Sequence, residues 1–294
     1  MPELDYFVVD VFTERALEGN PLAVVMNTCA LSTERMQSIA REFNLSETTF
    51  VERRPVAVER GEGVRVRIFT TQEELNFAGH PTLGTASVLR LQAPDTVQGR
   101  TVTLALNVGP VPVRFRAEGL FGEMTQKDPE FGAELERAEV ARLTGLELDD
   151  LDQKLPPRTV STGTAFAIVP LRSDAALARL RVKQEEATEW LRPRGARWFY
   201  VLGPAVGETH AWRARMQFYG GEDPATGSAA GCAISYLVAG GLVAGGETIH
   251  LRQGVEMGRP SDMFLSAHME SSKVRDVRVA GSTVLVAKGR LFLP

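Results

Sequence analysis

The sequence predicts an α+β protein with two similar halves. Three observations carry this prediction: segments with the alternating pattern of β-strands outnumber those with helical spacing, each half has one helix embedded among its strands, and a glycine-containing motif occurs once in each half. The chain has 294 residues, of which 44% are hydrophobic and 24% charged, and this is enough for one large domain or two medium ones.

The first half begins with strands. Alternating or β-branched runs predict them over residues 6–12, 22–25, 48–52, 64–69 and 102–116. A turn is predicted at 19–21. Ser32 is a typical N-cap for a helix whose apolar side chains recur at helical spacing as far as Phe43. A second helix is predicted over 81–91, with Pro81 in its first turn, where the N–H that proline lacks costs nothing.

The second half follows a stretch rich in Gly, Pro and charge around 118–132, which predicts a domain boundary. Helical spacing then predicts one helix that contains Val140 and Leu143, another over 174–180, and a long helix of small residues over 224–238. Strands are predicted over 159–160, 165–171, 198–202, 211–218, 248–253, 263–268, 274–279 and 283–287.

Composition points to a small-molecule ligand. The formal net charge is −4 without a basic block, whereas nucleic acid and anionic membrane surfaces require clustered Lys or Arg. The acidic start of the chain lacks the basic and apolar regions of a signal peptide, and no apolar run is long enough to span a membrane. We therefore expect a cytoplasmic protein that binds neither nucleic acid nor membrane.

The sequence does not predict a metal site or a cofactor. Only two cysteines are present, Cys29 and Cys232, and we expect both to be buried thiols. The four histidines lack the spacing of a metal site, and the glycine-rich, P-loop and His-Glu-x-x-His motifs are missing.

Two stretches resemble copies of one unit. His80-Pro81-Thr82-Leu83-Gly84-Thr85-Ala86 aligns with Asp223-Pro224-Ala225-Thr226-Gly227-Ser228-Ala229. Each follows a strand with an arginine next to an apolar residue, and each is predicted to open a helix. A helix N-terminus presents unpaired N–H groups and a partial positive charge, so it attracts anions.

This pair of helix starts predicts a carboxylate site. Gly79, Gly84 and Gly227 would let a ligand approach the backbone, and Thr85 and Ser228 would add hydroxyl donors in the first turn. Such a site would also stabilise the charge that develops when a proton leaves the carbon beside a carboxylate. The alternative is that both are ordinary proline-initiated helices with small residues for packing.

Glu47 is the candidate acid or base. It lies just past a predicted helix end at the start of a strand, and screening by Phe43 and Phe50 would suit it to take and give a proton near neutrality. The alternative is a solvated surface residue. His80 and Asp223 are candidates for substrate binding, and each also suits a helix cap.

Four motifs then follow one another across nearly the whole chain. They are Gly19-Asn20-Pro21-Leu22-Ala23-Val24-Val25, Asn44-Leu45-Ser46-Glu47-Thr48-Thr49-Phe50, Phe77-Ala78-Gly79-His80-Pro81-Thr82 and Glu222-Asp223-Pro224-Ala225-Thr226-Gly227-Ser228-Ala229. Together they resemble the PhzF family of phenazine-biosynthesis-like isomerases.

The resemblance implies a diaminopimelate-epimerase-like fold. It consists of two pseudo-symmetric domains, each a barrel-like sheet around a central helix, with the active site between them. The N-terminal domain would cover 1–118, completed by the last strand at about 282–294, and the C-terminal domain would cover 119–281. The central helices would start at Pro81 and Pro224. A homodimer is also implied.

The resemblance further implies isomerisation of trans-2,3-dihydro-3-hydroxyanthranilate, or a similar unsaturated carboxylic acid, without a cofactor. Glu47 would be the proton-shuttling acid/base, with His80 and Asp223 as partners in substrate binding and proton transfer. The residues implied to contact the substrate carboxylate and its neighbouring groups are Ser46, Gly79, Thr226, Gly227 and Ser228.

One segment departs from the family pattern. The family usually has a longer, proline-containing link before its Glu-Asp-Pro motif, whereas residues 215–221 are compact here and include Tyr219. This loop would shape the pocket and hence the choice of substrate.

Two alternatives stay open. An amino-acid epimerase or racemase on the same fold normally needs a thiol at each helix N-terminus, but Cys232 lies more than a turn inside its predicted helix, so such an enzyme would use non-Cys bases. The second alternative is a homologue that binds a small molecule without catalysing a reaction.

Overall fold

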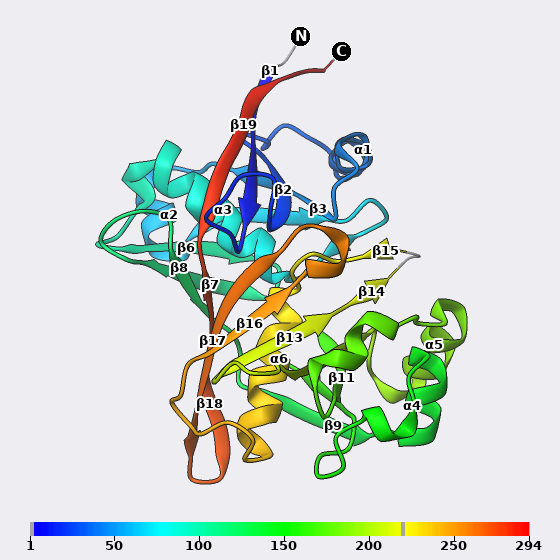
Figure 1. Cartoon of the computed structure of the whole chain (residues 1–294). Coiled ribbons are helices and arrows are strands. Elements are labelled where there is room, and N and C mark those ends of the chain that lie inside the picture. Colours follow the sequence, from blue (N-terminus) through cyan, green and yellow to red (C-terminus); the bar gives the residue numbers. More distant parts are fainter. Residues whose placement is uncertain (1–2, 219–220, 294) are drawn as a thin grey trace. The chain divides into compact units, whose positions relative to one another are not determined.

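The computed structural model describes residues 3–218 and 221–293. The chain divides into two compact units, which are Met1–Thr125 with Ala280–Pro294 (unit 1) and Gln126–Val279 (unit 2). Each unit combines a sheet with helices, and in each unit one long helix packs inside its own sheet (Figure 1).

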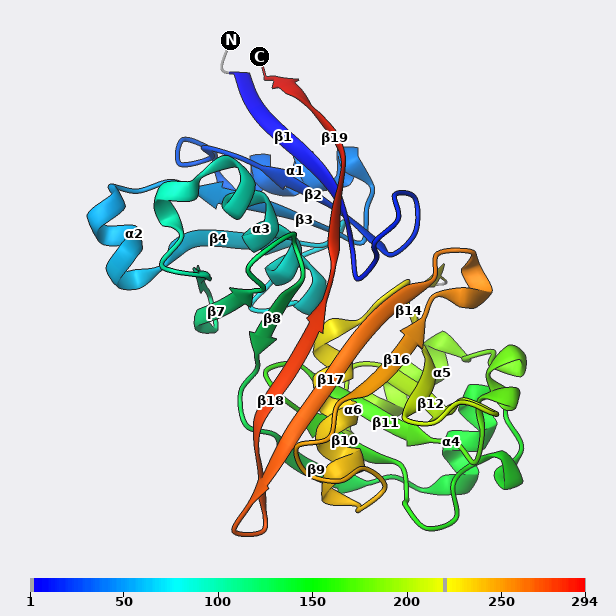
Figure 2. The ribbon, with the colours of Figure 1, turned by 60° about the vertical axis from the view of Figure 1, so that its left-hand side comes forward.

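The sheet of unit 1 is formed by strands from the first third of the chain and by its last strand. These strands are β1 (Glu3–Val11), β2 (Asn20–Val25), β3 (Glu47–Glu52), β4 (Val64–Phe69), β5 (Glu74–Leu75), β6 (Thr101–Leu106), β7 (Gly109–Phe115), β8 (Gly122–Thr125) and β19 (Thr283–Phe292). β1 lies between β2 and β19 and is antiparallel to both, so the two ends of the chain run side by side (Figure 2). From β2 the sheet continues through β3, β4, β6, β7 and β8, with β2–β3 and β4–β6 parallel.

The helices of unit 1 are α1 (Thr33–Phe43), α2 (Val56–Glu62) and α3 (Gly79–Gln92). α3 is the enclosed helix: it packs against β1, β2, β3, β6, β7, β8 and β19, and its residues from Gly79 to Leu89 are buried. A helix buried on all sides needs small residues where strands come close. A Cβ atom on Gly84 would lie 2.7 Å from side-chain atoms of Val11 and Leu22. Packing, rather than the predicted approach of a ligand, therefore accounts for Gly84.

The strands of unit 2 follow the order β9, β10, β11, β12, β13, β16, β17 and β18 within the large sheet, and β14 and β15 form a separate hairpin. Neighbouring strands are antiparallel except β11–β12 and β13–β16, which are parallel. The strands are β9 (Glu130–Glu134), β10 (Arg158–Ser161), β11 (Ala165–Pro170), β12 (Phe199–Pro204), β13 (Ala211–Arg215), β14 (Gln217–Phe218), β15 (Gly221–Glu222), β16 (Ile249–Gln253), β17 (Ser261–Glu270) and β18 (Lys273–Gly281).

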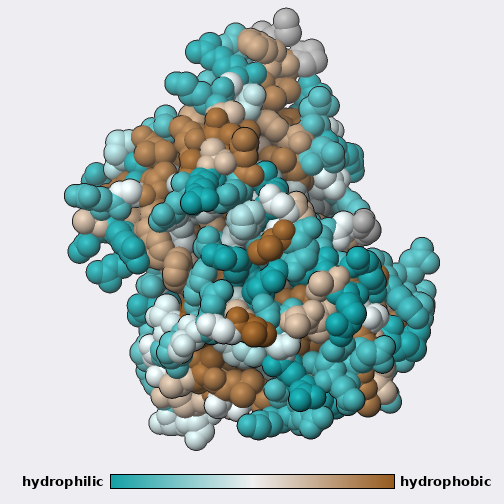
Figure 3. Space-filling model, viewed as in Figure 1, coloured by the Kyte–Doolittle hydropathy of each residue, from teal (hydrophilic) through white to brown (hydrophobic). Residues whose placement is uncertain are grey.

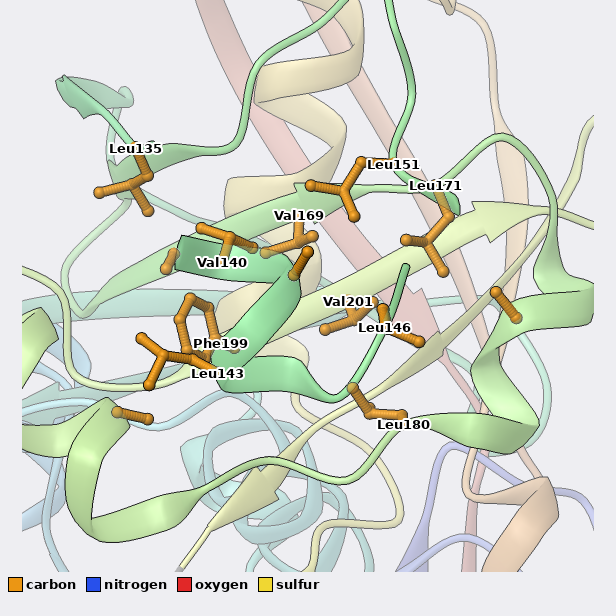
Figure 4. Close-up of a cluster of buried hydrophobic side chains, with 14 of the residues drawn as sticks. Leu135, Val140, Leu143, Leu146, Leu151, Val169, Leu171, Leu180, Phe199 and Val201 are labelled. Carbon is orange, nitrogen blue, oxygen red and sulfur yellow. The ribbon is translucent and has the colours of Figure 1, made fainter. Parts of the chain in front are cut away.

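The helices of unit 2 are α4 (Arg137–Thr144), α5 (Gln184–Leu191) and α6 (Gly227–Ala239). α6 is the enclosed helix, packed on β10, β11 and β17 with residues Gly227 to Val238 buried. A hydrophobic cluster fills the space between α4 and the strands β11 and β12 (Figure 4). In it, Val140 and Leu143 of α4 meet Val169, Phe199 and Val201 of the two strands. The sheet of unit 2 is thus covered by helices on both faces.

The surface mixes polar and apolar side chains. On the face in Figure 3, hydrophobic patches alternate with hydrophilic ones, as on most folded proteins. Among the described residues, no helix is both long enough and apolar enough to cross a membrane.

Several predicted elements agree with the structure, and others need correction. Ser32 caps α1 as predicted, accepting a hydrogen bond from the N–H of Arg35 at 3.3 Å. The predicted helix at 174–180 is a 3-10 helix over Asp174–Arg179. Asn20 and Pro21, predicted as a turn, are the first residues of β2. The helices α2 and α5, and the strands β8 and β9 in the stretch without a clear pattern, were not predicted.

Candidate active site

Glu47 and His80 meet within unit 1. Asn44 ends α1 in the left-handed conformation (φ 51°), and the chain enters β3 at Glu47. Side chains alternate along a strand, so Glu47 shares a face with Thr49, whose hydroxyl bonds that of Thr85 on α3 at 2.8 Å. Glu47 therefore faces α3, where His80 lies in the first turn. Oε2 of Glu47 is 3.4 Å from Nε2 of His80.

The surroundings of Glu47 differ from the prediction. Phe50 is three residues along the same strand, so its side chain points to the opposite face. There it packs with Met36 and Ile39 of α1, and Phe43 joins the same cluster. The predicted screening of Glu47 by these two aromatic rings is therefore wrong. Its partner is the imidazole of His80, and its side chain is 16% exposed.

His80 is held as a neutral imidazole. Burial lowers its pKa from 6.5 to about 3, so the contact with Glu47 is not an ion pair at neutral pH. The Nδ2 group of Asn20 lies 3.1 Å from Nδ1 of His80. Because an amide N–H can only donate, Nδ1 accepts and the ring proton is on Nε2, which faces Glu47.

The Nε2–H group is the chemically available end of this imidazole. Within the described residues, Nε2 of His80 is buried and forms no hydrogen bond, although Oε2 of Glu47 lies 3.4 Å away. A buried donor without an acceptor is costly, so a ligand oxygen placed here would gain a hydrogen bond. By donating to Nδ1, Asn20 therefore keeps the proton of His80 on Nε2, where it can be donated to a ligand. Its motif was singled out in the sequence, but its role was not.

Asp223 lies in unit 2, in the short segment between β15 and α6. The hydroxyl of Thr226 donates to Oδ2 of Asp223 at 2.6 Å. The amide Nε2 of Gln253 donates to the carbonyl oxygen of Asp223 at 2.8 Å and to the hydroxyl oxygen of Thr226 at 2.9 Å. Both Asp223 and Thr226 are buried. Thr226 is also the N-cap residue of α6, so this helix starts at Gly227 and the start predicted at Pro224 is wrong.

An arginine–glutamate pair occurs at the same place in both units and defines the register of the repeat. Arg67 binds both carboxylate oxygens of Glu74 at 2.8 and 2.6 Å, and Arg215 binds those of Glu222 at 2.8 and 2.5 Å. In each unit the enclosed helix begins five residues after this glutamate, at Gly79 or Gly227. The offset is 148 residues in all three comparisons, from 67 to 215, from 74 to 222 and from 79 to 227.

This register corrects the predicted repeat. His80 corresponds to Ser228, the second residue of α6, whereas Asp223 precedes α6 and corresponds to Leu75 on β5. The predicted alignment of His80 with Asp223 is therefore wrong by five residues, because proline, glycine and alanine matched by chance. Thr85 is likewise not in the first turn of its helix. It lies one turn further along and bonds Thr49.

The structure distributes the predicted substrate contacts over the two units. In unit 1, Ser46 is half-buried directly before β3, and Gly79 is the first residue of α3. In unit 2, Gly227 and Ser228 are the first two residues of α6. Within residues 3–218 and 221–293, no side chain caps either helix start by a hydrogen bond. Backbone N–H groups at such ends attract anions.

The two cysteines are poor candidates for acid/base work. Burial raises the pKa of Cys232 to about 11, and its thiol bonds the carbonyl oxygen of Thr164 inside unit 2. Cys29 is exposed rather than buried as predicted. The compact loop 215–221 is only partly described, because Tyr219 and Gly220 lie outside the described residues.

Sequence comparisons identify relatives over nearly the whole chain. The PhzC-PhzF family, described as phenazine biosynthesis-like protein, matches residues 9–289. The trans-2,3-dihydro-3-hydroxyanthranilate isomerase of Pseudomonas aeruginosa is 36% identical over 294 residues, covering 98% of this chain and 99% of that protein. An uncharacterized isomerase of Mesorhizobium japonicum is 34% identical over 316 residues, covering 100% of each.

Solved structures agree with these relatives. A PhzF-family protein of Bacillus anthracis superposes with a TM-score of 0.86 at 25% identity, with 100% of both chains covered. A predicted epimerase of Pseudomonas aeruginosa superposes with a TM-score of 0.84 at 35% identity, with 99% of this chain and 100% of that chain covered. A hydroxyproline epimerase of Agrobacterium vitis shares the fold alone. Its TM-score is 0.64 at 11% identity, with 98% of this chain and 92% of that chain covered. The predicted epimerase-like α+β fold is confirmed, and the chain belongs to the PhzC-PhzF family of phenazine biosynthesis-like proteins and is an isomerase.

Proposed function

We propose that the protein moves a proton on a small unsaturated carboxylic acid, similar to trans-2,3-dihydro-3-hydroxyanthranilate, without a cofactor. The observation that carries this proposal is the pair in unit 1, where the carboxylate of Glu47 lies 3.4 Å from the Nε2 atom of a neutral His80. Three relatives at 33–36% identity bear the name of that isomerase, which supports the choice of substrate class.

Glu47 is the group that carries the proton in this proposal. Its carboxylate takes a proton from a carbon next to the conjugated system, and the released electron pair forms a new double bond while the old one shifts. The carboxyl group then returns the proton to a different carbon, so that no atom is gained or lost. His80 cannot take this part at neutral pH, because burial makes its imidazolium form costly.

His80 and the helix starts stabilise the charge that develops. The Nε2–H of His80 donates a hydrogen bond to a substrate oxygen, and the N–H groups at the start of α3 favour negative charge nearby. Asp223, Thr226, Gly227 and Ser228 of unit 2 belong to the same proposed substrate site on the strength of the family resemblance. The proposal includes the cytoplasmic homodimer that the resemblance implies, and light scattering would measure the number of subunits.

Isotope uptake from heavy water tests this function. Purified protein without added cofactor is incubated with trans-2,3-dihydro-3-hydroxyanthranilate in D2O and followed by NMR. We expect a shifted double bond and a single deuteron at the carbon that receives the proton. A product with unmoved double bonds and an inverted centre would support an epimerase instead. Failure to convert this compound or related cyclic hydroxy acids would overturn the proposal.

A further inference from the structure

A chain of hydrogen bonds leads to the carboxylate of Asp223 from the interior of unit 2. Tyr200 on β12 donates its hydroxyl proton to Oε1 of Gln253 on β16 at 2.9 Å. Gln253 donates from Nε2 to the hydroxyl oxygen of Thr226, and Thr226 donates to Oδ2 of Asp223. Tyr200 and Gln253 are fully buried. Neither was singled out in the sequence.

The orientation of the Gln253 amide is determined by its neighbours. Oε1 receives two donors, the hydroxyl of Tyr200 and the backbone N–H of Thr226 at 3.2 Å. Nε2 faces two acceptors, the carbonyl of Asp223 and the hydroxyl of Thr226. A rotated amide would bring donor against donor and carbonyl against carbonyl, so only one orientation satisfies all four contacts. The three donors therefore all point toward Asp223.

We propose that Gln253 and Tyr200 are positioning residues that hold Asp223 as an ionised carboxylate with Oδ2 already bonded. Hydrogen bonds in a row polarise one another, so donation by Gln253 makes the Thr226 hydroxyl a better donor to a carboxylate. A proton that Asp223 takes up is thereby directed to Oδ1. That this proton takes part in turnover rests on the proposed function. The ionisation of Asp223 and its hydrogen bond to Thr226 do not depend on that function.

Ionisable neighbours of Asp223 lie on several elements. Tyr200 on β12 interacts electrostatically with Asp223, and Glu222 on β15, the residue before Asp223, is paired with Arg215 on β13. Burial raises the pKa of Tyr200 above its ordinary value, and it raises the pKa of Cys232 to about 11. Both groups therefore stay protonated over the pH range in which a carboxyl group titrates.

Carbon-13 NMR of side-chain carboxyl groups tests the proposal on the full chain. Protein labelled at the aspartate carboxyl carbon is titrated, and the signal of Asp223 is assigned by its loss in Asp223→Asn. In Gln253→Leu we expect the midpoint of Asp223 to rise by about one pH unit, because a hydrogen bond to a charged group is weakened. Thr226→Val, which removes the last donor, raises it further.

A matched control separates this effect from loss of packing. Gln126 is also a buried glutamine of unit 2 that binds α6, since its Nε2 donates to the carbonyl of Gly227 at 2.8 Å. Gln126→Leu removes hydrogen bonds to Gly227 and Thr162 instead, so we expect the Asp223 midpoint to stay unchanged. If Gln253→Leu fails to fold, Tyr200→Phe takes its place. This variant lacks a single oxygen atom, and we expect it to raise the midpoint of Asp223 by a smaller amount.

The results distinguish failure of this inference from failure of the proposed function. An Asp223 midpoint that is the same in wild type, Gln253→Leu and Tyr200→Phe overturns the inference, whatever the enzyme converts. A raised midpoint together with a wild type inactive on trans-2,3-dihydro-3-hydroxyanthranilate supports the inference and contradicts the proposed function. If the inference and the proposed function are both correct, Gln253→Leu lowers kcat/KM for trans-2,3-dihydro-3-hydroxyanthranilate about tenfold, by analogy with the loss of other positioning contacts.

Discussion

The side-chain amide of Asn20 donates to Nδ1 of His80 at 3.1 Å, which places the imidazole proton on Nε2, the nitrogen that faces Glu47. Asn20 is the first residue of β2, and Pro21 follows it. The contact joins residues 60 positions apart and gives Asn20 of the Gly19-Asn20-Pro21 motif a chemical role, because its amide binds the buried imidazole of His80.

Replacing Asn20 by aspartate should reverse the tautomer of His80. A carboxylate only accepts hydrogen bonds, so Nδ1 must then carry a proton, and Nε2 loses its own proton or the ring becomes charged. We expect isomerase activity to fall by about 100-fold, in the range of lost acid/base contributions. Nitrogen-15 NMR of labelled histidine checks the cause. A wild-type His80 that already carries its proton on Nδ1 would contradict this account.

His80 should make the protein less stable in acid. Its pKa is 6.5 in the unfolded chain and about 3 in the folded protein, so between these values only the unfolded state binds the proton. Stability therefore falls as the pH drops below 6.5, by up to about 1.4 kcal/mol per pH unit from this residue. Urea unfolding from pH 7 to 4.5 should show a flatter curve for His80→Gln than for wild type. Parallel curves would mean that His80 binds a proton as readily in the folded protein as in the unfolded chain.

Gly254 should matter for the segment that carries Asp223. Its φ is +76°, and a Cβ atom there would lie 2.3 Å from the carbonyl oxygen of Arg259 and 2.7 Å from that of Pro224. Gly254→Ala therefore combines backbone strain with displacement of Pro224, and we expect a loss of about 2–4 kcal/mol and at least tenfold lower activity.

Gly258 offers the matched control for that variant. Its φ is +72°, but a Cβ atom there meets nothing within 4 Å. Gly258→Ala should cost about 1 kcal/mol and leave activity intact, because only the left-handed backbone is strained. Urea unfolding and turnover measured on both variants separate the two effects. Equal losses in both would show that contact with Pro224 is unimportant.

The arginine–glutamate pairs should differ in their contribution to stability. Arg215 is 6% exposed and Arg67 is 16% exposed, and each binds its glutamate through two nitrogens. Lysine cannot reproduce this geometry. We expect Arg215→Lys to lower the free energy of unfolding by about 1–3 kcal/mol and Arg67→Lys by less, since an ion pair contributes less to stability as its exposure to water increases. Denaturant unfolding of the two variants decides whether burial sets this order.

Sequence patterns predicted helices and strands well where residues close together in the chain determine the local structure. Ser32 capped α1, and the strand predicted over 64–69 has the same bounds as β4. The long helix of unit 1 was predicted from Pro81 in its first turn, and α3 begins two residues earlier, at Gly79. The helix α6 was predicted from its small residues, but its start was placed at Pro224. Its true start depends on Thr226 and Gln253, which are 27 residues apart, and sequence-local patterns contain no such information.

The residues of the candidate site could be proposed from the sequence, but their hydrogen-bond partners could not. Glu47, His80 and Asp223 came from motifs, whereas their hydrogen-bond partners depend on strand pairing. The register of the repeat failed for a related reason. Its signal is a pair of arginine and glutamate seven residues apart, Arg67 with Glu74 and Arg215 with Glu222, and the residues between them are dissimilar.

The most direct test of the central claim compares two glutamates on one strand. Glu47 and Glu52 are at opposite ends of β3 and point to opposite faces, and Glu52 lies 3.9 Å from Arg65. Wild type, Glu47→Gln and Glu52→Gln are assayed for deuterium uptake from D2O into trans-2,3-dihydro-3-hydroxyanthranilate. We predict that uptake falls at least 100-fold in Glu47→Gln and is unchanged in Glu52→Gln. Uptake by Glu47→Gln at the wild-type rate would contradict the assignment of Glu47 as the group that carries the proton.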